Sequence, residues 1–167
     1  MKKIILVGYM GSGKTTIGKE LADNLQIPFI DLDQYIEVKE QLKITDIFDK
    51  KGEVYFRKKE HMYLKELMER TENFVLSLGG GTPCYANNHL YLQSKDVESI
   101  YLKASITTLE NRLTISTNRP LLKHVTNLKE YIAQHLFERN YFYNFSQHTI
   151  VIDNKDTEII VDEILKL

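Results

Sequence analysis

Short runs of apolar residues recur along the chain, and stretches with the periodicity of amphipathic helices separate them. A short apolar run of this kind is typical of a buried β-strand. The predicted strands are Lys3–Val7, Pro28–Asp31, Asn73–Leu78, Glu98–Leu102 and Thr149–Ile152.

Between these runs, apolar residues return at the spacing of a helix with one buried face. The predicted helices are Thr15–Leu25, Asp33–Lys39, Gly52–Arg70, Thr107–Leu113, Leu128–Phe145 and Thr157–Leu165. The alternation predicts an α/β fold, in which a five-stranded, mostly parallel sheet is flanked by helices on both faces. Ligands of such sheets bind beyond the carboxyl ends of the strands, where we expect Gly8, Asp31 and Gly79.

The whole chain, residues 1–167, is predicted to be a single domain. Its length and its 43% of hydrophobic residues suffice for one substantial core. No repeat and no Pro-, Gly- or Ser-rich linker divides it. The segment Ile115–Thr126 follows neither period and contains Pro120, so we expect a mobile loop there.

A glycine-rich segment, Gly8 to Thr15, follows the first predicted strand and has the pattern G-x-x-x-x-G-K-T. In a phosphate-binding P-loop, backbone N–H groups surround a phosphate and the next helix presents its positive end. Lys14 would reach the β- and γ-phosphates, and the Thr15 hydroxyl would bind Mg²⁺. A glycine-rich turn with a chance lysine is the alternative, but the strand–loop–helix order favours the P-loop.

Charge and cysteine content exclude some classes of protein. Lys and Arg total 22 against 23 Asp and Glu, a formal net charge of −1, which argues against a nucleic-acid-binding protein. The single cysteine, Cys84, allows no disulfide within the chain and fits a reducing compartment. The run Ile4 to Val7 is too short for a signal sequence or membrane span. We therefore expect a cytoplasmic protein with no membrane partner.

Two features of other P-loop proteins are missing. The guanine-specific N-K-x-D motif of GTPases is only approximated by Asn154-Lys155-Asp156, where the acid comes one residue too early. The strand Asn73–Leu78 runs into Gly79, Gly80 and Gly81 and lacks the acidic residue at the end of a Walker B strand. The carboxylate on the magnesium side must therefore come from elsewhere, and Asp31 is available.

Asp31 and Asp33 stand on either side of one leucine at the end of the second predicted strand. Alternation along an extended strand would place both carboxylates on one side. One could then hold the metal while the other takes a proton from a substrate hydroxyl. The alternative is that Asp33 merely caps the following helix.

Three arginines are candidates for anion binding. Arg139 lies seven residues after Ile132 within an apolar stripe, so its charge needs an anionic partner, and its planar fork suits a carboxylate. Arg57 precedes Glu60 on a mixed helix face, and a solvated salt bridge is the simpler interpretation there. Arg119 lies in the predicted loop, where it could close over a transferring phosphoryl group.

The glycines Gly79, Gly80 and Gly81 end the third predicted strand and suggest an edge where a small ligand approaches the backbone. Cys84 follows shortly after. No base is placed beside it by the sequence, so we interpret it as an inert thiol.

In their order and spacing, these motifs make the chain resemble the shikimate kinase family, within the nucleoside-monophosphate-kinase-like P-loop proteins. The resemblance spans nearly the whole chain. It is carried by GYMGSGKTTIGKELA, FIDLD, DIFDKKGEVYFRKKE, LSLGGG, TNRPLL and ERNYFY. It implies Mg²⁺-dependent transfer of the ATP γ-phosphate to the 3-hydroxyl of shikimate, on the route to chorismate and the aromatic amino acids.

The resemblance also implies residue roles. ATP would be bound by Gly11, Ser12, Gly13, Lys14, Thr15, Thr16, Arg112 and Arg119, and Mg²⁺ by Thr15 and Asp31. Shikimate would be bound by Asp33, Arg57, Gly79, Gly80 and Arg139, within a region over about residues 32–70 and beyond. Lys14, Asp33 and Arg119 would be catalytic, with Arg119 in a lid over about residues 115–125. Relatives carry a basic residue against adenine after the last strand, and Lys155 is the candidate here.

Two other functions stay open at this level. A kinase for gluconate or a nucleotide would share the P-loop but would not need two arginines on one carboxylate. A P-loop module that binds ATP as a signal without transferring phosphate is a further alternative, against which Lys14, Thr15, Asp31 and Asp33 speak. We expect a monomer whose partners are shikimate and ATP.

Overall fold

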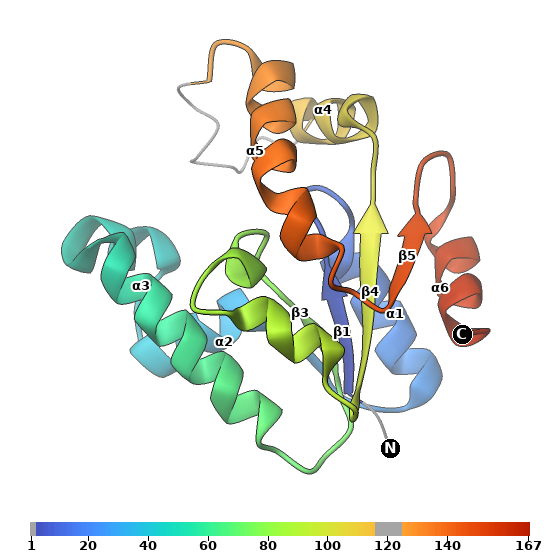
Figure 1. The fold of residues 1–167 in the computed structure, drawn as a ribbon, viewed down its shortest axis with the longest axis horizontal. Coiled ribbons are helices and arrows are strands. Elements are labelled where there is room, and N and C mark those ends of the chain that lie inside the picture. Colours follow the sequence, from blue (N-terminus) through green and yellow to red (C-terminus); the bar gives the residue numbers. More distant parts are fainter. Residues whose placement is uncertain (1–2, 116–124) are drawn as a thin grey trace.

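A computed structural model describes residues 3–115 and 125–167 of the chain. A central sheet has the strand order β2-β3-β1-β4-β5, and all neighbouring strands in it are parallel (Figure 1). The strands are β1 (Lys3–Val7), β2 (Phe29–Asp31), β3 (Val75–Ser77), β4 (Val97–Lys103) and β5 (His148–Val151). The predicted five-stranded α/β sheet is confirmed, and it is parallel throughout.

All six predicted helices are present; α6 has the predicted bounds, and the other five have one or both ends shifted. They are α1 (Lys14–Leu25), α2 (Leu32–Glu40), α3 (Ile44–Met68), α4 (Ile106–Ile115), α5 (Leu128–Tyr143) and α6 (Thr157–Leu165). Two 3₁₀ turns that the sequence did not predict, η1 (Thr82–Cys84) and η2 (Asn88–Gln93), lie between β3 and β4.

The predicted start of the third helix at Gly52 matches the second of two helical segments in α3, whereas the first segment, which begins at Ile44, was not predicted. Gly52 has φ 82° and ψ 168°, a left-handed backbone conformation that glycine adopts without strain. The glycine therefore breaks α3 into two helical segments, residues 44–51 and 53–68.

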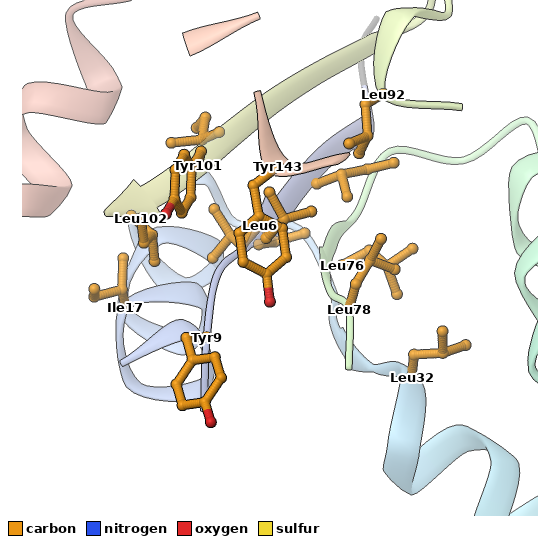
Figure 2. Close-up of a cluster of buried hydrophobic side chains, with 14 of the residues drawn as sticks. Leu6, Tyr9, Ile17, Leu32, Leu76, Leu78, Leu92, Tyr101, Leu102 and Tyr143 are labelled. Carbon is orange, nitrogen blue, oxygen red and sulfur yellow. The ribbon is translucent and has the colours of Figure 1, made fainter. Parts of the chain in front are cut away.

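Helices cover the two faces of the sheet, and β4 shows how its side chains are divided between them. The Tyr101 hydroxyl donates to the Asn140 side chain of α5 at 2.9 Å, and the Tyr101 ring lies 5.1 Å from that of Tyr143. The next residue, Leu102, points to the opposite face. In Figure 2, Tyr101 and Tyr143 are neighbours, and Leu102 lies towards Ile17 of α1. Both faces of the strand are buried, as its apolar sequence predicts.

The strand β3 is shorter than the predicted Asn73–Leu78. Only residues 75–77 pair with the three-residue strand β2 on one side and with β1 on the other. Phe74 and Leu78, just outside the strand, are nevertheless almost fully buried. The length of the apolar run therefore indicates which residues are buried. The strand itself is shorter, because it ends where its partner β2 ends.

Candidate active site

A cleft of about 520 Å³ opens beyond the carboxyl ends of the central strands. Its walls come from the P-loop and the start of α1, from the ends of β2 and β3, and from α4 and α6. The lining residues are Met10, Gly11, Gly13, Lys14, Thr15, Thr16, Ile17, Asp31, Asp33, Ser77, Leu78, Gly79, Gly80, Arg112, Lys155, Thr157 and Ile160. The cleft thus gathers most of the side chains that the sequence singled out.

The P-loop connects β1 to α1 as predicted, and two of its glycines are required by geometry. A β-carbon on Gly8 would lie 2.7 Å from the carbonyl oxygen of Leu102 in β4. Gly13 has φ 89° and stands immediately before α1. The turn therefore aims the unpaired N–H groups of the first turn of α1 at the cleft, which is the geometry of an anion site.

Two cations face the P-loop. The Lys14 ammonium donates to the carbonyl oxygens of Gly8 and Tyr9 at 2.8 and 3.0 Å, so it lies over the loop itself. The Arg112 guanidinium of α4 donates to the Gly11 carbonyl at 3.1 Å. Both charges can therefore reach a polyphosphate held by the loop.

Thr15 and Asp31 place a hydroxyl and a carboxylate together at the base of the cleft. The Thr15 hydroxyl donates to Asp31 Oδ2 at 3.1 Å. Within the part of the chain that is described, no cluster of three or more His, Cys, Asp or Glu side chains could hold a metal. Mg²⁺ is usually held by one or two carboxylates together with phosphate oxygens and water, so this pair fits Mg²⁺ carried by a nucleotide.

The predicted alternation of Asp31 and Asp33 along a strand is wrong, because β2 ends at Asp31 and α2 begins at Leu32. Asp31 itself is the N-cap: its Oδ1 accepts from the backbone N–H groups of Asp33 at 3.1 Å and Gln34 at 3.3 Å. The alternative that Asp33 caps the helix is wrong for the same reason. Both carboxylates still line the cleft.

Asp33 lies in an unusual electrostatic environment. Burial, the nearby Asp31 charge and the Glu60 charge raise its pKa from 3.8 to about 6, whereas Lys14 and Arg57 act in the opposite direction. The carboxyl group is therefore mostly ionised at neutral pH but binds a proton more readily than an ordinary aspartate does. These are the properties of a general base.

Arg57 is held by a buried acid that the sequence did not single out. Glu60, one turn later on α3, is 1% exposed and accepts from Arg57 Nη1 at 2.8 Å. The Thr82 hydroxyl of η1 donates to the other Glu60 oxygen at 2.6 Å. The Arg57 side chain is only 18% exposed, so the solvated salt bridge suggested by the sequence is wrong.

Arg139 extends from α5 towards the same turn. Its guanidinium carbon lies 5.6 Å from the centre of the Tyr9 ring. The fully buried Tyr143, one turn later, donates its hydroxyl to the Gly80 carbonyl at 2.5 Å. No carboxylate in the described ranges forms an ion pair with Arg139, so its charge can serve an external anion.

The triple-glycine turn brings the two arginines together. A β-carbon on Gly81 would lie 2.9 Å from Arg57 Nη2, and one on Gly80 would lie 3.4 Å from Arg139 Nη1. A β-carbon on Gly79 would lie 3.0 Å from the Asp33 carboxylate. Two guanidinium groups and one carboxylate thus surround a backbone that carries no side chains.

Residues from the segment after β5 also line the cleft. Lys155 lines the cleft, and its ammonium donates to the Glu163 carboxylate at 2.7 Å. Thr157 and Ile160 of α6 lie beside it, and Arg112 of α4 also lines the cleft. This surface combines the apolar side chain of Ile160 with the side chains of two basic residues, Arg112 and Lys155. Such a surface suits a flat heterocyclic ring.

Arg119 and Cys84 are the last two residues that the sequence analysis considered. Arg119 lies outside the described residues, as does most of the expected lid. Cys84 is half-buried, and burial raises the pKa of its thiol to about 11. The thiol therefore stays protonated at neutral pH, which agrees with its interpretation as inert.

Comparisons with known proteins identify relatives that match the whole chain. The family model described as "Shikimate kinase" matches residues 10–167. A shikimate kinase from Flavobacterium psychrophilum is 53% identical over 170 residues, which cover 100% of this chain and 99% of that protein.

Solved structures agree with the sequence relatives. A crystal structure of shikimate kinase from Bacteroides thetaiotaomicron has a TM-score of 0.90 and 36% identity, with 99% of each chain covered. A shikimate kinase from Acinetobacter baumannii in complex with shikimate has a TM-score of 0.89 and 35% identity, over 99% of this chain and 92% of that one. The fold is thus shared over 99% of the chain.

Proposed function

The chain belongs to the shikimate kinase family, and we propose that its cleft transfers the γ-phosphate of ATP to the 3-hydroxyl of shikimate. This activity places it in the synthesis of chorismate and the aromatic amino acids. The observation that carries the proposal is a cleft in which the P-loop lies beside Asp33, with two arginines against the turn Gly79–Gly81 at its edge.

In this proposal, Asp33 handles the proton of the attacking hydroxyl. The hydroxyl oxygen forms a bond to the γ-phosphorus, its proton passes to Asp33, and ADP leaves with the bridging oxygen. A pKa of about 6 suits this role, because the carboxylate is ionised before the reaction and is basic enough to take the proton. Lys14 stabilises the charge on the transferring phosphoryl group.

Thr15 and Asp31 would hold Mg²⁺ together with the phosphates. When bound, the ion would neutralise charge on the β- and γ-phosphate oxygens. Gly11, Ser12, Gly13 and Thr16 complete the ATP site at the loop and the start of α1.

Arg112 and Lys155 are proposed to lie along the adenine. Both line the cleft. Because the Lys155 ammonium is already paired with Glu163, its alkyl stem rather than its charge would lie against the ring.

Other assignments rest on the family resemblance. We assign residues 32–70 as the core of the shikimate-binding region and residues 115–125 as a lid, from which Arg119 would reach the γ-phosphate. None of the helices among the described residues is long and apolar enough to span a membrane. We propose that the protein acts in the cytoplasm as a monomer.

The arginine pair gives the proposal a direct test. If Arg57 and Arg139 both bind the shikimate carboxylate, replacing either with alanine should raise the KM for shikimate about tenfold to a hundredfold, because a charge-assisted hydrogen bond contributes roughly 1.5–3 kcal/mol. The KM for ATP should change little. Lysine should restore only part of the affinity, because it keeps the charge but not the planar fork. Steady-state kinetics with each substrate varied measures both constants.

Two controls complete this test. Arg70→Ala removes an arginine just after α3 that donates to Tyr35, and it should leave both KM values unchanged. An acceptor analogue with a carboxamide in place of the carboxylate should be a poor substrate for the wild type. The arginine variants should lose much less on it than on shikimate. Equal losses on both acceptors would show that the arginines act on structure rather than on the carboxylate.

A further inference from the structure

Tyr85 is an aromatic residue at the acceptor pocket with no place in the core. It follows η1 directly, in an extended conformation, and its side chain is 40% exposed. Its ring centre nevertheless lies only 4.0 Å from the guanidinium carbon of Arg57. The other arginine–ring contacts of the described residues are longer, with Arg139 5.6 Å from the Tyr9 ring. The face of the Tyr85 ring is therefore stacked against the guanidinium.

The stack sets the orientation of the Arg57 guanidinium plane, which the ion pair with Glu60 leaves free. Glu60 holds Arg57 through one nitrogen, Nη1, at 2.8 Å. One hydrogen bond anchors that end of the group but allows the guanidinium plane to tilt. A ring at stacking distance sets the plane itself. Because a carboxylate binds an arginine fork in its plane, the orientation of that plane decides how well Arg57 can bind it.

A third residue links the ring to the same arginine. Glu53 Oε1 accepts from the Tyr85 hydroxyl at 3.3 Å and lies 3.4 Å from Arg57 Nε. Both distances are long, and Glu53 is 54% exposed. The contribution of this link should be small compared with that of the ring face.

An outer pocket of about 490 Å³ lies beside this stack. Arg57 and Tyr85 both line it, together with Val54, Lys58 and His61. Without the ring against it, the arginine would have room to turn outwards into this pocket. Turning outwards would weaken its attraction for an anion in the cleft.

We propose that Tyr85 is a positioning residue for the acceptor carboxylate, acting by stacking on Arg57. This inference rests on the proposed binding of shikimate by Arg57. Tyr85 does not touch the reacting atoms in this account, so its effect belongs to acceptor affinity and not to the chemical step.

Tyr85→Leu removes the π face while keeping apolar bulk. We expect the KM for shikimate to rise about three- to tenfold, from the strength of an exposed to partly shielded cation–π contact. The kcat and the KM for ATP should stay within about twofold of the wild-type values, because the lost contact acts on acceptor binding. Tyr85→Phe keeps the ring and should resemble the wild type. Tyr141→Leu, which removes an exposed ring that contacts only Phe142 and Phe145 among the described rings, is the matched control.

The double variant identifies the partner. In an Arg57→Ala background, Tyr85→Leu should change the KM for shikimate by less than about twofold, because the group that the ring positions is already gone. Thermal melts of all variants report folding, and Tyr85→Met repeats the comparison if the leucine variant does not fold.

Each result decides between the two claims. If Arg57→Ala raises the KM for shikimate but Tyr85→Leu and Tyr85→Met do not, the positioning role of Tyr85 is wrong and the proposed function stands. An equal effect of Tyr85→Leu on the KM for shikimate in the wild-type and the Arg57→Ala backgrounds also overturns the positioning role. If the wild type does not phosphorylate shikimate, the proposed function itself fails.

Discussion

Lys14→Ala is expected to lower kcat by at least about a hundredfold to a thousandfold, because it removes a preorganised cation that stabilises charge on the transferring phosphoryl group. The fold should remain intact. In the structure the Lys14 ammonium contacts the carbonyl oxygens of Gly8 and Tyr9 at the surface of the cleft, away from the core. Initial rates at saturating ATP and shikimate measure the loss, and circular dichroism checks the fold.

The same helix supplies the control for this variant. Lys19 lies on an exposed face of α1 and does not line the cleft. Lys19→Ala should therefore keep the wild-type rate. A folded Lys14→Ala enzyme that also keeps the wild-type rate would remove the assignment of this loop as the phosphate site.

Asp33→Asn should lower kcat by about a hundredfold to ten-thousandfold, which is the typical contribution of a general base. The amide is similar in shape to the carboxylate but cannot accept the proton. For the wild type, kcat/KM should fall as the pH is lowered through about 6, because Asp33 becomes protonated there. Asp49→Asn, an exposed carboxylate on α3, should leave the rate and the profile unchanged. A wild-type profile that stays flat from pH 8 to pH 5 would contradict the role of Asp33.

The raised pKa of Asp33 also predicts a change in stability. The folded protein binds this proton with a pKa of about 6, whereas the unfolded chain does so near 3.8. The protonated carboxyl thus favours folding, and this contribution is full below pH 3.8 and lost as the pH rises through 6. Asn cannot ionise, so Asp33→Asn should raise the melting temperature of the ligand-free protein at pH 8 but hardly at pH 4. Calorimetry at the two pH values measures the difference.

Much of the fold could be predicted because a few elements carry unambiguous patterns. The strand Lys3–Val7 and the helix Thr157–Leu165 were predicted with the bounds that the structure has. In both cases the apolar residues of the run or stripe are buried in the core: Ile5, Leu6 and Val7 in the strand, and Ile160, Val161 and Ile164 in the helix. The start of α3 could not be predicted in this way, because Gly52 interrupts a helix and the sequence alone suggests a beginning.

The candidate site was predictable where the motif itself fixes the backbone. Gly8 to Thr15 encode their own turn, so the P-loop follows from local sequence. The role of Glu60 does not, because Arg57 and Glu60 at this spacing look like a surface pair. The acid is buried where Thr82, twenty-two residues later, donates to it. The stack of Tyr85 on Arg57 depends on the same long-range contact between η1 and α3.

Transfer of phosphate to shikimate can be observed directly. The purified protein is incubated with ATP, Mg²⁺ and shikimate, and the products are identified by phosphorus NMR and mass spectrometry. We expect one ADP for each shikimate monophosphate, with the phosphate on the 3-hydroxyl and no product without shikimate. Formation of ADP at the same rate without shikimate, or an unmodified acceptor after complete consumption of ATP, would contradict the proposed function.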